Sequence, residues 1–399
     1  MKPATRTRPS KAPRAPRPDT QTQDPGDAYV AALARAALDD ELLGQERALD
    51  TLSKALGSGH FPHAWVFYGP SGIGKCTTAM RVAALLVDPL TVDAGRIACA
   101  PTRDSHSARL LRAGTHPDVR VIRAELASSS ADRELRERKQ LNIPVGLLRE
   151  HMIGGVDSGG GRLEAPIARS SALGAGKVFI IDGADRLEAD GQNVLLKTLE
   201  EPPAGTTIIL VTRSVDRLLP TIRSRCQSVG FAPLSAPLMS RWLDTKLGEV
   251  TGTSRAFVEL FAAGSPGAAV TAVELGLQSW YEELVPMIDR FARGECPLEL
   301  ADRMNDIASD IAEAAIKRNE NASKEAANRD AVGVLLAVIG REVERRLHAS
   351  AQNHRALAYW AQVPGVIAAA ERNLSANVNQ KLALAEFVAQ WSMLTGQTL

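Results

Sequence analysis

Residues Gly69 to Cys76 form a glycine-rich loop, GPSGIGKC, with the pattern GxxxxGK. Such a loop binds phosphate when a strand precedes it and a helix follows it, because N–H groups at the start of the helix then point at the phosphate oxygens. Both neighbours are predicted here, Ala64 to Tyr68 as a buried strand and Thr77 to Leu86 as a helix. The loop residues predicted to bind a nucleotide are Gly69, Gly72, Gly74 and Lys75.

The segments downstream of this loop predict a parallel sheet covered by helices. Lys177 to Asp182 (KVFIID) and Thr206 to Thr212 (TTIILVT) are short, apolar and rich in β-branched residues, as buried strands are. Between them, Asp190 to Glu201 has apolar residues at helical spacing, and two prolines stop the helix. Residues 28–232 are therefore predicted to form one α/β domain around the phosphate-binding loop.

After Pro233 the strand pattern disappears, and helices are predicted to the end of the chain. We expect residues 233–278 to form a small helical lid and residues 279–399 to form an all-helical C-terminal domain. One face of the last helix is apolar, which is typical of core, although a partner subunit could also cover it. This stripe consists of Leu384, Phe387, Val388, Trp391 and Leu394.

Three segments are predicted to lie outside this framework. Residues 1–27 combine basic residues with prolines and threonines and have too little apolar surface to fold, so we expect a disordered basic tail. Such a tail could contact DNA phosphates without sequence specificity, although a solvated tail is the simpler interpretation. Ala131 to Gln140 is charged and Gly154 to Gly161 is glycine-rich, and both are predicted to be surface insertions.

The composition argues against several classes of protein. The 399 residues carry a formal net charge of +1, which gives no overall attraction to nucleic acid. The sequence shows neither an apolar run of about 18 residues nor a secretory signal, so we expect the protein to be located in the cytoplasm. The four cysteines are too far apart for a disulfide framework or a four-thiolate zinc site. Cys99, His106 and His116 could supply three metal ligands, but their spacing matches no common site.

Several positions of the predicted nucleotide site are unsuited to hydrolysis. Cys76 follows the loop lysine, where a hydroxyl normally binds Mg²⁺, and sulfur is a soft ligand for a hard cation. Asp182 ends its strand and suits the metal site, but Gly183 follows where a glutamate would orient water. Asp185 is an alternative base, although an aspartate there more often caps a turn. We therefore expect the hydrolytic base to be absent.

A set of motifs in fixed order carries a family resemblance. The motifs are LGQ at 43–45, HA at 63–64, NVLLKTLEEPP at 193–203 and TIRSRC at 221–226. With them the chain resembles the bacterial clamp-loader subunits of the AAA+ class, and most of all the delta-prime family of DNA polymerase III, over about residues 40–270. The resemblance implies an AAA+ P-loop domain, a helical lid and a C-terminal helical collar through which subunits form a ring.

The resemblance also implies roles for individual residues. Arg225 would be an arginine finger, acting in trans on ATP bound to a neighbouring motor subunit; the alternative is an arginine paired with a local carboxylate. The motor subunits carry a lid arginine in a GSxRxA motif, and Gly267 stands at that position here. Three positions thus lack the residue that an active ATPase of this family would have: Cys76, Gly183 and Gly267. We expect no intrinsic ATPase activity, while weak ATP binding through the loop and Asp182 stays open.

The implied function is that of a stator within the DNA polymerase III holoenzyme. Its partners would be gamma/tau-like motor subunits and a delta subunit, with the sliding clamp and primed DNA reached through the complex during replication. No cofactor is expected to be required, and no zinc, because Arg96 to His116 lacks the four cysteines of the motor subunits' zinc module. The alternatives are an active gamma-like ATPase motor and an AAA+ interaction protein outside replication.

Overall fold

The structure is a computed structural model that describes residues 25–137, 142–318, 324–376 and 378–398. Residues 1–24 of the predicted tail and 138–140 of the predicted charged insertion lie outside these ranges. Helix α1 (Pro25–Asp39) begins within the last residues of the segment predicted as tail. Its first turn makes a tertiary contact that composition does not show, since the Asp27 carbonyl lies against Gly114.

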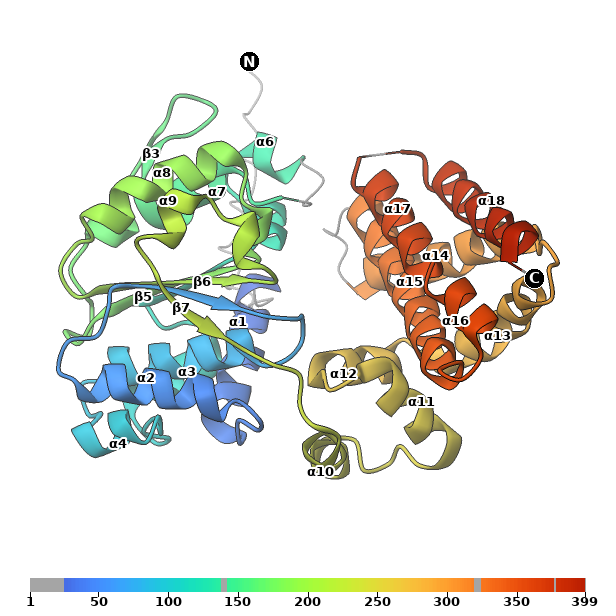
Figure 1. Ribbon diagram of the computed structural model, residues 1–399. Helices are drawn as coiled ribbons and strands as arrows, with labels where there is room; N and C mark the ends of the chain where they lie inside the picture. Colours follow the sequence, from blue (N-terminus) through green and yellow to red (C-terminus); the bar gives the residue numbers. More distant parts are fainter. Residues whose placement is uncertain (1–24, 138–141, 319–323, 377, 399) are drawn as a thin grey trace, which may run out of the picture.

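A five-stranded parallel sheet forms the centre of the first domain (Figure 1). In spatial order its strands are β2 (Val119–Ile122), β5 (Lys177–Asp182), β6 (Thr206–Thr212), β1 (Ala64–Tyr68) and β7 (Gln227–Gly230). The three strands predicted from sequence are confirmed at their predicted bounds, and they are the inner three. Four of the five residues of β1 are buried, and Tyr68 is the exception. Burial on both faces explains why the strand is apolar throughout and does not alternate between apolar and polar residues.

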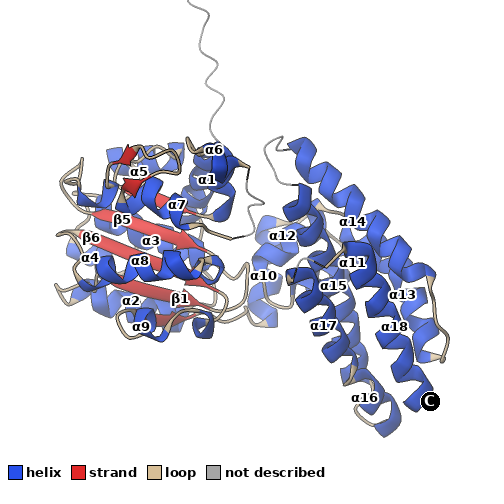
Figure 2. Ribbon diagram, turned by 90° about the horizontal axis from the view of Figure 1, so that it is seen from above, coloured by secondary structure: helices blue, strands red, loops and turns tan. Residues whose placement is uncertain are grey.

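Helices cover both faces of this sheet (Figures 1 and 2). Alternate residues of one strand serve the two faces: Ile180 packs in one core and Phe179 in the other. The first face is covered by α1, α2 (Glu46–Gly57), α3 (Lys75–Val87) and α5 (His106–Ala113), and α4 (Asp93–Ile97) packs on α2. On the other face lie α6 (Arg133–Arg136), α7 (Val145–Leu148), α8 (Ala189–Glu200) and α9 (Pro220–Arg223).

Short elements complete this domain. The 3₁₀ turns are η1 (Ala124–Ser129), η3 (Pro166–Ala168), η4 (Ala184–Arg186) and η5 (Val215–Arg217), and η2 (Arg149–Ile153) is a π-helical turn. The glycine-rich stretch predicted as a surface insertion contains the turn of a short hairpin, in which β3 (Gly155–Val156) pairs antiparallel with β4 (Arg162–Leu163). The hairpin forms because Asp157 accepts a backbone hydrogen bond from Gly161 at 2.6 Å and so closes the turn.

The remainder of the described chain is helical, as predicted. The lid region consists of α10 (Ala236–Lys246), α11 (Gly252–Ala262) and α12 (Pro266–Glu274). It lies between the sheet domain and the C-terminal helices (Figure 2). Those helices are α13 (Leu277–Ala292), α14 (Glu299–Arg318), α15 (Lys324–Ala349), α16 (His354–Trp360), α17 (Val363–Ser375) and α18 (Gln380–Thr398).

The lid and the C-terminal helices have separate cores that meet on one helix. The apolar stripe of α18 is core: Trp391 is fully buried, stacks on Phe291 at 4.5 Å and donates to the Tyr359 hydroxyl at 2.8 Å. Helix α15 contributes Val338 to the lid core and Ile339 to the C-terminal core. Among the described residues, no helix has the length and apolar character needed to cross a bilayer.

Candidate functional site

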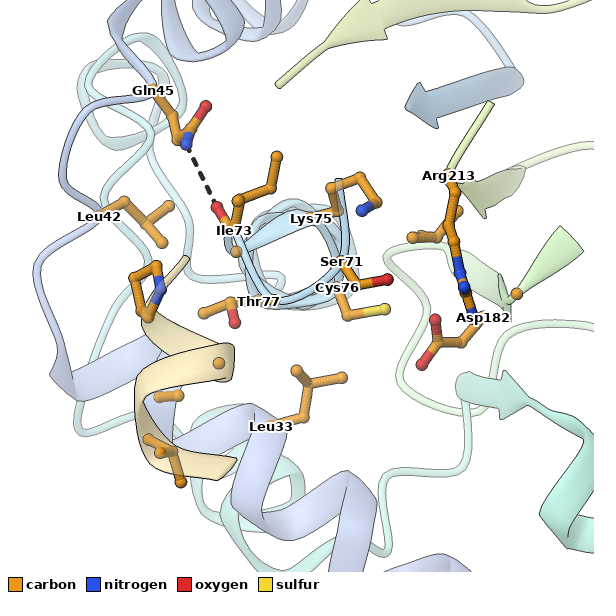
Figure 3. Close-up of a pocket in the computed structure, with 18 of the residues that line it drawn as sticks. Leu33, Leu42, Gln45, Ser71, Ile73, Lys75, Cys76, Thr77, Asp182 and Arg213 are labelled. Carbon is orange, nitrogen blue, oxygen red and sulfur yellow. Dashed lines mark hydrogen bonds between the residues drawn. The ribbon is translucent and has the colours of Figure 1, made fainter. Parts of the chain in front are cut away.

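The phosphate loop lies between β1 and α3 and borders a cavity of about 540 Å³. Gly72 (φ +73°) and Gly74 (φ +95°) have left-handed backbone that other residues rarely adopt, which explains the loop's glycines. The apolar residues that line the cavity include Leu33, Leu42, Leu43, Trp242 and Val270. Its polar lining includes Tyr29, Lys75, Cys76, Asp182 and Arg213, and Figure 3 shows Lys75, Cys76, Asp182 and Arg213 near one another. A cavity of this size, lined by apolar residues and a few polar ones, has the general form of a nucleotide pocket.

Lys75 is turned toward the loop that carries it. Its ammonium donates to the carbonyl of Gly69 at 2.7 Å and to the carbonyl of Pro70. Burial lowers the pKa of Lys75. The lysine predicted to reach a phosphate therefore binds carbonyl oxygens of its own chain in this structure.

Asp182 is surrounded by hydrogen-bond donors. The Tyr29 hydroxyl donates to its Oδ2 at 2.6 Å, and the Cys76 thiol lies in contact with the same carboxylate. Burial raises the pKa values of both Tyr29 and Cys76, so the two groups keep their protons at neutral pH. This arrangement does not fit Mg²⁺, because the cation prefers several oxygen acceptors and here meets a thiol and a hydroxyl already bonded to the carboxylate.

The lid packs directly on the phosphate loop. The backbone N–H of Gly267 donates to the Gly72 carbonyl at 2.8 Å, and the Ser265 hydroxyl donates to the Ser71 carbonyl at 2.9 Å. A Cβ atom at Gly267 would lie 2.7 Å from the Gly72 Cα. The position at which the resemblance implies a lid arginine thus has no room for any side chain in this closed arrangement.

The residues that follow Asp182 build a turn. Gly183 has left-handed backbone with φ +79°. The Asp185 carboxylate is 3% exposed and accepts from the Thr212 hydroxyl at 3.2 Å and the Arg213 N–H at 3.4 Å. Arg217 lies 3.7 Å from its other oxygen. These are the contacts of an aspartate that organises a turn at the end of β6.

Arg225 lies outside the pocket, between α9 and β7. Its Nη2 is 2.5 Å from Glu200 Oε1, and its Nη1 donates to the Thr221 carbonyl at 2.9 Å. The side chain is 35% exposed. Arg225 is not among the residues that line the cavity in the described chain. The structure brings together the predicted nucleotide-binding residues and separates them from the predicted finger.

Sequence reasoning missed Tyr29 and Arg123 as pocket residues. The Arg123 guanidinium lies 3.8 Å from the centre of the Tyr29 ring, which is a cation–π contact. Tyr29 and Asp182 are 153 residues apart, so no local spacing connects them. For Gln45 a sequence signal was available, because the LGQ motif was recognised. Its side-chain amide donates to the Ile73 and Ala232 carbonyls and so connects the phosphate loop to the segment after β7.

Two of the three residues considered as metal ligands, His116 and Cys99, contact polar groups of the chain itself. His116 contacts the Ser107 hydroxyl through Nε2 at 2.9 Å and accepts from the Asp118 N–H through Nδ1 at 3.1 Å. The Cys99 thiol faces the Leu49 carbonyl. Among the described residues, no group of His, Cys, Asp and Glu has the geometry of a metal site.

Comparisons with known proteins agree with the motifs. Residues 44–235 match the family model described as "DNA polymerase III, delta subunit". DNA polymerase III subunit delta′ of Pseudomonas aeruginosa is 31% identical over 233 residues, covering 58% of this chain and 61% of that protein. The delta′ subunit of Escherichia coli is 32% identical over 220 residues, covering 54% of each chain.

A gamma subunit also matches. DNA polymerase III subunit gamma of Buchnera aphidicola is 32% identical over 186 residues, covering 47% of this chain and 43% of that protein. The chain thus spans between about two fifths and three fifths of the length of these relatives. Over the matched residues the chain is therefore similar to the delta′ subunits of DNA polymerase III.

Proposed function

We propose that this chain is a clamp-loader stator that supplies Arg225 in trans to the ATP site of a neighbouring motor subunit. The observation that supports this most directly is the position of Arg225. It is exposed at the domain edge, outside the chain's own pocket, so it can reach a nucleotide only on another subunit. A guanidinium placed there would stabilise the charge that develops on the transferred phosphoryl group.

The surroundings of Arg225 suit a residue that changes partner. Its contact with Glu200 is an exposed ion pair, and such pairs contribute about 0–1 kcal/mol. The backbone around it is firmly held, because Ile222 and Leu199 are buried in the core of the sheet domain. A rigid base with a weakly held guanidinium can therefore form a bidentate contact with phosphate at little cost in stability.

The chain's own pocket supports a stator over a motor. Lys75 and Asp182 bond within the chain, and Gly183 and Gly267 replace the residues that hydrolysis would need. The partners proposed on this basis are gamma/tau-like motor subunits and a delta subunit, with the sliding clamp and primed DNA as targets of the assembled complex. Replication in the cytoplasm is the corresponding setting.

The test is ATP hydrolysis by a reconstituted clamp loader that contains wild-type chain or Arg225→Ala. We expect the variant to assemble normally and to lower hydrolysis at the adjacent site by roughly 10³-fold. Arg223→Ala is the matched control, because Arg223 is in the same motif, equally exposed and paired with Asp216. Equal effects of both substitutions would contradict the finger assignment. Turnover by the isolated chain that Lys75→Ala abolishes would identify a gamma-like motor instead.

A further inference from the structure

The Asp182 carboxylate occupies the place from which the sequence expects a metal ion to be held, yet its Oδ2 accepts a hydrogen bond from within the chain. Tyr29 approaches it from α1, a helix that precedes the sheet domain's first strand. Cys76 approaches it from the start of α3. We propose that Tyr29 acts as a built-in plug, whose hydroxyl takes the metal position beside Asp182 and excludes Mg²⁺ from this pocket.

The chemistry of the two donors supports exclusion. Mg²⁺ requires near-octahedral oxygen coordination and binds through acceptor lone pairs, whereas Tyr29 presents a proton to Asp182 and Cys76 offers a soft sulfur beside it. Replacing the Tyr29 bond with a metal would break a hydrogen bond of 2.6 Å to a carboxylate and would bring the cation near the Arg123 guanidinium.

The helix that carries Tyr29 is fixed at both ends. At its start, Gly114 fits against the Asp27 carbonyl so closely that a Cβ would lie 2.2 Å from that oxygen. At its end, Arg81 donates to the Ala37 carbonyl at 2.8 Å, and Arg112 forms two hydrogen bonds with Asp39. With Arg123 stacked on its ring, Tyr29 is held in position before any ligand arrives, which is what a plug requires.

This inference goes beyond the stator proposal, because it concerns the chain's own pocket and does not depend on Arg225. The plug also predicts a different outcome from the one expected if Cys76 alone excluded the metal. If sulfur at position 76 were the whole obstacle, Cys76→Thr would restore the metal site. With the plug in place, a hydroxyl at position 76 still meets an Asp182 that is bonded to Tyr29.

The experiment measures binding of ATP to the full-length chain by calorimetry, with excess Mg²⁺ and with EDTA. The variants are Cys76→Thr, Tyr29→Phe and the double variant Cys76→Thr/Tyr29→Phe. We expect wild type and Cys76→Thr to show no Mg²⁺ dependence, and the double variant to bind ATP at least about tenfold more tightly with Mg²⁺ than with EDTA. Binding of Mn²⁺, followed by electron paramagnetic resonance, provides a second readout that needs no nucleotide.

The matched control is Cys76→Thr/Tyr359→Phe. Like Tyr29, which is half-buried, the buried Tyr359 has a hydrogen-bonded hydroxyl, but it lies in the C-terminal core, where it accepts from Trp391. Mg²⁺ dependence in Cys76→Thr alone would overturn the proposal, as would a double variant that binds neither Mg²⁺-ATP nor Mn²⁺. If Tyr29→Ala weakens ATP binding equally with Mg²⁺ and EDTA, Tyr29 is a base-stacking residue and the plug is wrong.

Discussion

The phosphate loop and the Arg225 edge belong to the same sheet domain, but their charged groups are partnered in different ways. In the pocket, Lys75 bonds to loop carbonyls and Asp182 bonds to Tyr29, and both contacts are buried or half-buried. At the edge, Arg225 and Glu200 meet with 35% and 50% of their side chains exposed. The first set of contacts is internal to the fold, and the second is open to solvent.

The difference shows how one domain can be closed to one ligand and open to another. Leaving a buried donor or acceptor without its partner costs about 1–3 kcal/mol, so the pocket resists rearrangement. An exposed ion pair contributes about 0–1 kcal/mol and can be exchanged for a better partner. We therefore expect changes at the edge to alter activity in the assembly, and changes in the pocket to alter mainly the stability of this chain.

The largest effect is expected from Arg225→Lys, which keeps the charge and removes the planar fork. Hydrolysis at the adjacent motor site should fall by roughly 10²- to 10³-fold, because an ammonium cannot make the bidentate contact. Steady-state hydrolysis by the reconstituted complex measures this, with Arg223→Lys as control. Full activity of the lysine variant would mean that the edge contributes only a point charge.

Gly72→Ala should be the most damaging small change in the pocket. A Cβ there would lie 2.5 Å from the Ser265 hydroxyl, in addition to the backbone strain at φ +73°. We expect a loss of about 2–3 kcal/mol in the free energy of unfolding. Gly74→Ala is the matched control, because its φ is +95° but its Cβ would meet nothing within 4 Å. Equal losses in urea unfolding would show that the lid does not press on the loop.

Lys75→Ala tests whether the pocket contributes to stability and not to turnover. The variant should lose about 1–2 kcal/mol of stability, since the carbonyls of Gly69 and Pro70 lose a charged donor. Hydrolysis by the reconstituted complex should stay at the wild-type level, because the pocket is not used for turnover. A complex that loses activity with Lys75→Ala while remaining assembled would place this pocket in the motor cycle.

The smallest effect is expected from Asp39→Asn, which loosens α1. The hydrogen bond from Arg112 lowers the pKa of Asp39, so its stabilisation is present above the unfolded-state pKa and disappears as the pH falls through the lowered folded-state value. At neutral pH the variant should be less stable by under about 1 kcal/mol, since the pair is exposed. Below the folded-state pKa the two proteins should unfold alike, and a difference that persisted in acid would rule out the charge as the cause.

The parts of the fold that could be predicted are those with strong local patterns. Strands β1, β5 and β6 were found at their bounds because burial on both faces makes them continuous apolar runs. The outer strands β2 (VRVI) and β7 (QSVG) were missed, because they are short and each carries exposed residues. The glycine-rich insertion was predicted as a loop, because nothing in its composition shows the pairing of β3 with β4.

For the candidate site, sequence indicated which residues would matter but not their partners. Gly72 and Gly267 were singled out separately, and only the fold shows that each is opposite the other. A local carboxylate for Arg225 was an open alternative, and Glu200 takes that place in the isolated chain. Tyr29 was passed over entirely, because its partners come from distant strands and loops and leave no periodic signal.

Helix α15 couples the lid mechanically to the C-terminal helices. Its 26 residues extend about 39 Å at the usual rise per residue, and consecutive residues Val338 and Ile339 are embedded in two different cores. Close-packed cores transmit displacement instead of absorbing it. If the lid tilts away from the phosphate loop, α15 would therefore move the C-terminal helices with it as a rigid unit. Because this unit is long, a sub-ångström displacement at Gly72 and Gly267 would become a larger displacement at its far end.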